Sequence, residues 1–393
     1  MTSLSEKGFN PDAVGSLISG ILFGSAIGAM SFIVQPVFVQ GISNGLGFSA
    51  EQAGYAASAE MSGFALATIL LVFLAGKINW HKAFYFLLSC IVLGNLLSSV
   101  IASDFNMFLV TRMMAGIGSG GVVSLSFAMV GMTSNPDRNF GLMVSVAMIS
   151  GAIVMYLAPG IMEASGLSGL LYLFSALGAV GLFLVRFAPL SLKEEAQDTL
   201  EVSQTNWMPI LLSVGAMFAF WLAQGGVWAY LGLMGEVKEA GVDDISKALT
   251  LSQFSGLAGA LLPVIFASRF GRVWPMALAL LAGVLPLLIF IYGTGGVQEF
   301  LIIALIYNFG FNLGHPYLLA IMANLDATGR VVIYSVAAQT IGMAVGPAVT
   351  ANVLSEFGYN GIAWFGIFFF IATFMMILAS TTNFTKNGKI QST

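Results

Sequence analysis

Long hydrophobic stretches separated by short polar ones dominate the sequence. A membrane-spanning helix needs about 20 predominantly apolar residues, and twelve windows of this kind can be placed along the chain. They cover residues 14–39, 49–75, 83–102, 107–132, 140–163, 169–188, 208–234, 246–268, 274–293, 299–323, 331–355 and 361–380. Strands of a membrane barrel would instead alternate over segments of about ten residues, a pattern not found here. We therefore expect an all-α membrane protein with twelve transmembrane helices.

The composition supports an integral membrane protein and excludes several other classes. Hydrophobic residues make up 58% of the 393 and charged residues only 8%, whereas soluble domains are about one quarter charged. The net charge of −4 and the lack of a basic cluster predict no nucleic-acid partner. One cysteine and two histidines cannot form a structural zinc site, so we expect no cofactor.

The basic residues predict the orientation in the membrane. If the N-terminus is cytoplasmic, eleven of the 14 Lys and Arg residues lie on the cytoplasmic side, two lie on the opposite side, and Arg112 lies within a helix. Cytoplasmic loops carry an excess of Lys and Arg, so both termini are expected in the cytoplasm. The start of the chain lacks the pattern of a cleaved signal peptide. These features predict a multi-pass protein of the plasma or inner membrane.

The chain is also expected to contain two similar halves. A polar stretch at 191–206 separates residues 1–190 from 207–393, with six predicted helices in each part. Gly166-Leu-Ser-Gly169 matches Gly358-Tyr-Asn-Gly361 at an offset of 192 residues, and other short matches occur at offsets of 190 to 193. Because each half has an even number of helices, both copies have the same orientation in the membrane. We expect two pseudo-symmetric six-helix bundles joined by a cytoplasmic linker.

This organisation resembles the major facilitator superfamily of transporters, and local patterns support the resemblance. Ser268-Arg269-Phe270-Gly271-Arg272 is similar to the basic loop that the family carries between the second and third helices of a half. Arg112 and Gly116 match the family's R-x-x-x-G pattern in helix four, which implies a cavity-facing arginine linked to proton coupling. The G-x-x-x-G-P string of proton-driven antiporters stands here in helix eleven, ending at Pro347, rather than in helix five.

Glu60 and Arg112 are the only ionised residues well inside the predicted helices. Burial raises the pKa of a carboxyl group and a cationic neighbour lowers it, so a glutamate under both influences can titrate near the working pH. We expect Glu60 to carry a proton and Arg112 either to tune it or to bind an anionic solute. The alternative is a purely structural ion pair. The glycines that follow Arg112 are expected to serve close helix packing rather than nucleotide binding.

Other polar and aromatic residues in the apolar segments are candidates for a substrate site. Asn308, Asn312 and His315 have the spacing of one helix face, and Trp221, Gln224 and Trp228 have a similar spacing. The alternatives are ordinary packing for His315 and a place in the membrane-interface aromatic belt for Trp228. The predicted substrate-binding set is Ser31, Gln35, Trp221, Gln224, Trp228, Asn308, Asn312, His315 and Gln339.

These features predict a secondary active transporter of a small organic solute that works by alternating access, with proton coupling. The alternatives are a proton-independent facilitator or exchanger and a multidrug-type efflux antiporter. No nucleophile–base pair or metal cluster in the sequence suggests an enzyme. The expected partners are the solute, protons and the lipid bilayer, and the expected state is a monomer.

Overall fold

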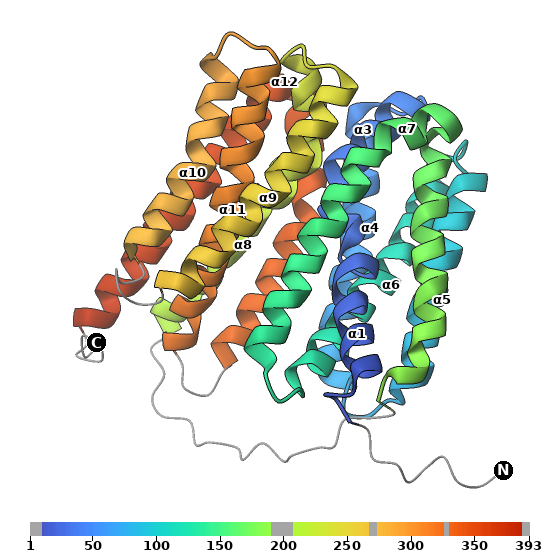
Figure 1. Cartoon of the computed structure of the whole chain (residues 1–393). Helices are drawn as coiled ribbons and strands as arrows, with labels where there is room; N and C mark the ends of the chain where they lie inside the picture. Colours follow the sequence, from blue (N-terminus) through green and yellow to red (C-terminus); the bar gives the residue numbers. More distant parts are fainter. Residues whose placement is uncertain (1–9, 190–206, 267–272, 326–329, 387–393) are drawn as a thin grey trace, which may run out of the picture.

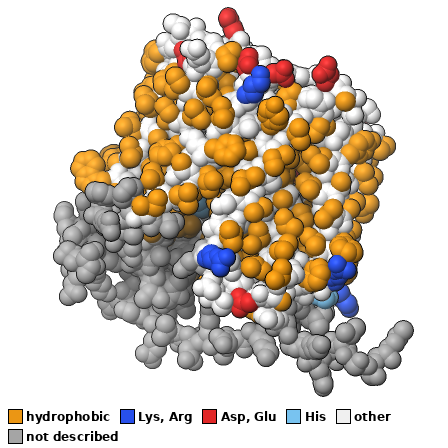
Figure 2. All heavy atoms as spheres, in the orientation of Figure 1, with side chains coloured by type: hydrophobic (Ala, Val, Ile, Leu, Met, Phe, Trp, Pro, Cys, Tyr) orange, Lys and Arg blue, Asp and Glu red, His pale blue; other side chains and the backbone are white. Residues whose placement is uncertain are grey.

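The computed structural model describes residues 10–189, 207–266, 273–325 and 330–386. The linker predicted at 191–206 and the basic loop at 268–272 lie outside these residues. The described part is almost entirely helical (Figure 1). Its hydrophobic side chains cover the flank of the molecule, whereas charged side chains gather at the two ends of the face in Figure 2. This distribution fits a protein surrounded by lipid.

The twelve predicted crossings are all present, although helices are joined or broken at several points. The first crossing consists of α1 (Val14–Leu22), the π-helix η1 (Phe23–Ile27), α2 (Met30–Ile33) and α3 (Gln35–Gly45). Long helices form most of the others: α4 (Ala50–Leu74), α5 (Trp80–Val100), α6 (Phe105–Gly131), α8 (Trp207–Val237), α9 (Val242–Phe266), α10 (Val273–Tyr292) and α11 (Val297–Leu325). The remaining four crossings lie in α7 (Pro136–Leu184, followed by the short 3₁₀ helix η2, Val185–Phe187) and in α12 (Arg330–Lys386).

Two glycines divide α7 and α12 into two crossings each. Gly166 has φ 62° and ψ −163°, and Gly358 has φ 64° and ψ −167°. This region of backbone space is accessible to glycine and costly for other residues. The two positions match each other in the sequence repeat, so equivalent turns occupy equivalent places. The internal repeat is confirmed at this point.

Helix packing follows the same scheme in both halves. In the N-terminal half α4 and α5 both pack on α6, and in the C-terminal half α9 and α10 both pack on α11. The halves meet through α3 with α8, α4 with α12, and α7 with α9. Two pseudo-symmetric bundles are therefore present, as the repeat predicted.

The glycines after Arg112 bring α6 close to α4 and α5. A Cβ atom at Gly116 would collide with the backbone oxygen of Glu60, and one at Gly120 with that of Phe64. On another face of α6, Gly118 lies against the backbone of Leu87 on α5. Small residues permit this distance between backbones, which confirms the helix-packing prediction.

Hydrogen bonds between the two halves lie in the middle and at one end of the bundle. We define the far end as the end opposite to that at which α1 begins and α12 ends (upper end in Figure 1). At the far end, the Glu236 carboxylate accepts hydrogen bonds from Gln40 (2.7 Å) and Asn44 (2.6 Å), and Tyr55 donates one to Asn352 (2.9 Å). Where both partners are described residues, no hydrogen bond or ion pair joins the halves at the near end. The described parts of the two halves are thus linked asymmetrically along the bundle axis.

Candidate functional site

Arg112 and Glu60 lie together inside the N-terminal half. Arg112 on α6 is fully buried, and Glu60 on α4 is 4% exposed. Their closest atoms, Arg112 Nη2 and Glu60 Oε1, are 3.7 Å apart. The pair is therefore an ion pair without the short, direct hydrogen bond that arginine and carboxylate usually form.

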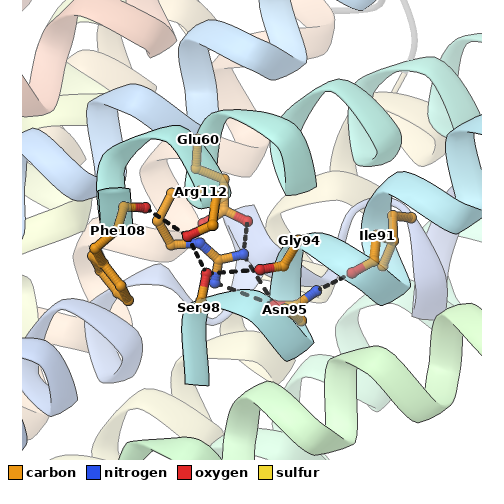
Figure 3. A network of polar contacts seen from close by, with 8 residues as sticks. Glu60, Ile91, Gly94, Asn95, Ser98, Phe108 and Arg112 are labelled. Atoms are coloured by element: carbon orange, nitrogen blue, oxygen red, sulfur yellow. Dashed lines mark hydrogen bonds and ion pairs between the residues drawn. The ribbon is translucent and has the colours of Figure 1, made fainter. Parts of the chain in front are cut away.

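Asn95 on α5 is the closer partner of Arg112 (Figure 3). Its Oδ1 atom accepts hydrogen bonds from Nη1 at 3.2 Å and from Nη2 at 3.0 Å. The Asn95 amide nitrogen donates to the Ile91 carbonyl at 2.8 Å, which directs the oxygen towards Arg112. The ring of Phe38 lies 5.1 Å from the guanidinium carbon, within the range of a cation–π contact. Arg112 is thus held by α5 and α3 as well as by its charge partner.

Asn95 and Phe38 were not identified from the sequence. The available signal was an asparagine followed by a serine three residues later, Asn95 and Ser98, in an otherwise apolar helix. The hydroxyl groups of Ser98 and Thr111 lie 2.8 Å apart, and Thr111 is next to Arg112 on α6. This contact is a second polar link between α5 and α6.

A small cavity borders Glu60 on the side of the broken first crossing. Its polar lining is Ser31, Glu60, Asn95 and Ser119, and apolar residues such as Phe174 complete it. The cavity has a volume of about 10 Å³, roughly the lower limit for a single water. The Ser31 hydroxyl faces the Glu60 carboxylate but forms no well-aligned hydrogen bond. The cavity suits water or a proton carrier and is too small for an organic solute.

A second group of predicted residues meets between the halves. The Trp221 ring on α8 lies 5.8 Å from Phe32 of the N-terminal half, and 5.1 Å from both Phe311 and His315 on α11. Nε2 of His315 is 3.1 Å from Oε1 of Gln339 on α12. Trp221, His315 and Gln339 are therefore brought together by three helices, with Phe32 as a contribution from the other half.

Ser31, Gln35, Trp221 and Gln224 carry buried polar atoms that have no hydrogen-bond partner among the described residues. These atoms are Ser31 Oγ, both polar amide atoms of Gln35, Trp221 Nε1 and Gln224 Oε1. Gln35, Trp221 and Gln224 are at most 5% exposed. A buried polar group left without a partner costs about 1–3 kcal/mol. Gln35, Trp221 and Gln224 are therefore available to a ligand or to water, whereas the Ser31 hydroxyl faces Glu60.

Trp228 closes the contact between the halves instead of offering a free polar atom. Its Nε1 donates to the Phe32 carbonyl at 3.0 Å. In a regular helix that carbonyl would accept from residue 36, but Pro36 has no N–H group. The proline thus leaves a carbonyl that the indole of the other half satisfies.

Asn308 and Asn312 lie on α11 and contact α9. Asn308 Nδ2 donates to the Ser252 carbonyl at 2.9 Å, and Asn312 Nδ2 donates to Asn308 Oδ1 at 2.8 Å. Gly256 on α9 makes room for both carboxamides. Their amides are therefore used in packing α9 on α11, whereas His315 contacts α8 and α12. A role for the two asparagines in substrate binding stays a prediction.

The chain is similar to known transporters in both sequence family and fold. The family model described as Major Facilitator Superfamily matches residues 18–347. The crystal structure of a mutant of the nucleoside transporter NupG is similar with a TM-score of 0.71 and 15% identity, covering 94% of this chain and 99% of that chain. No curated protein matches the sequence. With twelve crossings in two similar bundles, the chain belongs to the major facilitator superfamily and is a membrane transporter of small solutes.

Proposed function

We propose that this transporter moves a small organic solute by alternating access and that Glu60 couples the movement to protons. The observation that carries the proposal is the loose contact between Glu60 and Arg112. Arg112 donates hydrogen bonds from both terminal nitrogens to Asn95, and the nearest Glu60 oxygen is 3.7 Å away. A carboxyl group in this position can exist in either protonation state without breaking a short hydrogen bond to the arginine.

The cavity beside Glu60 supports a route for the proton. Glu60 shares it with Ser31, Asn95 and Ser119, and it has room for about one water. Ser31 belongs to α2, a helix of only four residues. The next residue, Phe32, packs on Trp221 of the other half. Adjacent residues of α2 therefore contact the proton site and the inter-half site, so a shift of α2 would link the two.

The asymmetric contact between the halves supports alternating access. The halves are hydrogen-bonded in the middle and at the far end, as by Tyr230 to the Ala50 carbonyl at 3.1 Å. With both termini in the cytoplasm, as the basic residues predict, the far end faces outward. The structure would then represent a conformation closed to the outside. Rocking of one half against the other would break these contacts and close the near end.

The experiment is transport in proteoliposomes with Glu60→Gln beside the wild type. Radiolabelled uridine, glucose and alanine represent three solute classes, and the similarity to a nucleoside transporter makes uridine the first choice. We expect an inward proton gradient to drive accumulation of one of them in the wild type. Glu60→Gln should lose this accumulation and keep exchange of the same solute. Glu163→Gln, at an exposed position on α7, is the matched control.

Equal gradient-driven accumulation by Glu60→Gln would overturn the coupling role. The second candidate is a proton-independent facilitator or exchanger, which is favoured by the complete burial of Arg112 and its hydrogen bonds to Asn95. In that case the pair is structural, and an ionophore that collapses the proton gradient leaves the flux unchanged.

A further inference from the structure

Two helices that pack on each other across the halves, α3 and α8, carry buried polar atoms without a hydrogen-bond partner among the described residues. Four buried side-chain atoms on these helices have no such partner: both polar amide atoms of Gln35, Trp221 Nε1 and Gln224 Oε1. Gln35 and Gln224 are 2% and 1% exposed. Gln35 belongs to α3 of the N-terminal half and Gln224 to α8 of the C-terminal half, and these two helices pack on each other. A solute that satisfied both amides would contact both halves.

The surrounding rings define the shape that such a solute would need. Trp221 is the centre of the group, in contact with the rings of Phe32, Phe311 and His315. Phe32 is three residues before Gln35, and Gln224 is three residues after Trp221. Residues three apart are neighbours on a helix surface, although the chain bends at Val34 between α2 and α3. Flat faces beside amide groups favour a planar solute.

The charge of the solute follows from the side chains in this group. The group contains no Asp, Glu, Lys or Arg; its members are Phe32, Gln35, Trp221, Gln224, Phe311 and His315. Arg112 and Glu60 face each other inside the N-terminal half, and Lys238 is paired with Glu299 at 2.8 Å. An ionised solute would lose its hydration here without gaining a counter-charge, which is costly. The site therefore favours an uncharged molecule.

We propose that the interface between the first crossing and α8 binds an uncharged, planar heteroaromatic solute that both donates and accepts hydrogen bonds. Gln35 offers a donor and an acceptor, Trp221 Nε1 a donor, and Gln224 Oε1 an acceptor. Trp221 provides the ring against which the solute stacks. This assignment rests on the proposed transport function and names the solute class for it.

The test is a thermal-shift and binding experiment on the full-length protein in detergent. Nicotinamide, nicotinate and N1-methylnicotinamide share one ring and differ in charge, and uridine is a larger uncharged member. We expect uridine or nicotinamide to raise the unfolding temperature and the anion and cation to leave it unchanged. Gln35→Leu and Gln224→Leu should raise Kd about tenfold or more, since each removes one buried hydrogen-bonding partner. Trp221→Phe keeps a ring and should weaken binding less than Trp221→Ala.

Gln298→Leu, at an exposed glutamine at the start of α11, is the matched control and should bind as the wild type does. Stabilisation by the charged compounds, unchanged Kd in both glutamine variants, or no stabilisation by any uncharged compound would each overturn the assignment. Failure of the solute assignment can be told apart from failure of the transport proposal. Proton-driven uptake of a charged solute would contradict only the solute class, and binding of uridine without proton-driven uptake would contradict only the coupling.

Discussion

Arg112 donates hydrogen bonds from both of its terminal nitrogens to a single oxygen of Asn95, at 3.2 and 3.0 Å, although a carboxylate lies nearby. Asn95 is itself oriented by the Ile91 carbonyl. The arginine is thus held by a neutral partner on α5, and Glu60 is left at 3.7 Å. Asn95 on α5 thus competes with Glu60 for the terminal nitrogens of Arg112.

Replacing Asn95 by alanine should shift the pH dependence of transport. Without its Asn95 partner, Arg112 would turn towards Glu60 and favour the ionised carboxylate. We expect the pH of half-maximal transport to move towards acid, with a stability loss of about 1–3 kcal/mol from the lost buried hydrogen bonds. Uptake rates across a pH series measure the first effect. Ser99→Ala is the control, since that hydroxyl bonds to the Leu96 carbonyl of its own helix, and an unchanged pH profile in Asn95→Ala would contradict this role.

Gly116→Ala should destabilise the protein, because the added Cβ would collide with the Glu60 backbone oxygen. Overpacking of this kind costs about 1–3 kcal/mol. Gly160→Ala is the matched control on α7, since a Cβ there meets no atom within 4 Å. Helix propensity should make that change neutral or stabilising by up to about 1 kcal/mol. Thermal unfolding in detergent compares the two, and equal unfolding temperatures would argue against tight α4–α6 packing.

Linking Tyr55 to Asn352 should stop transport. These side chains are hydrogen-bonded across the halves at 2.9 Å. We expect Tyr55→Cys with Asn352→Cys, in a Cys90→Ala background, to be cross-linked by a short bifunctional thiol reagent that reduction can cleave. The link would hold the far end closed, so uptake should fall and recover on reduction. Each single cysteine variant is a control, and full uptake by the linked protein would contradict rocking at this end.

Trp228→Phe should leave the Phe32 carbonyl without a donor, because Pro36 cannot supply one. The expected cost is about 1–3 kcal/mol in thermal or chemical unfolding. Pro36→Ala restores an N–H group at position 36, so it should recover part of that loss in the Trp228→Phe background. Additive effects of the two changes would show that the indole and the proline do not act on one carbonyl.

The number of crossings and the duplicated architecture could be predicted from the sequence. A bilayer requires apolar stretches of a fixed minimum length whose backbone groups are paired within a helix, so hydropathy alone located all twelve. The glycines at 166 and 358 match by spacing, and they have similar backbone conformations in a region that only glycine adopts readily.

The partners of the polar side chains were decided by the tertiary structure. Helical spacing placed Asn308, Asn312 and His315 on one face, yet the asparagines contact α9 and His315 contacts α8 and α12. Periodicity tells which residues share a face, and it does not tell which neighbouring helix lies against each turn of that face. For the same reason the sequence did not single out Asn95. Its importance comes from Arg112 on another helix, which only the packing of α5 on α6 brings within hydrogen-bonding distance.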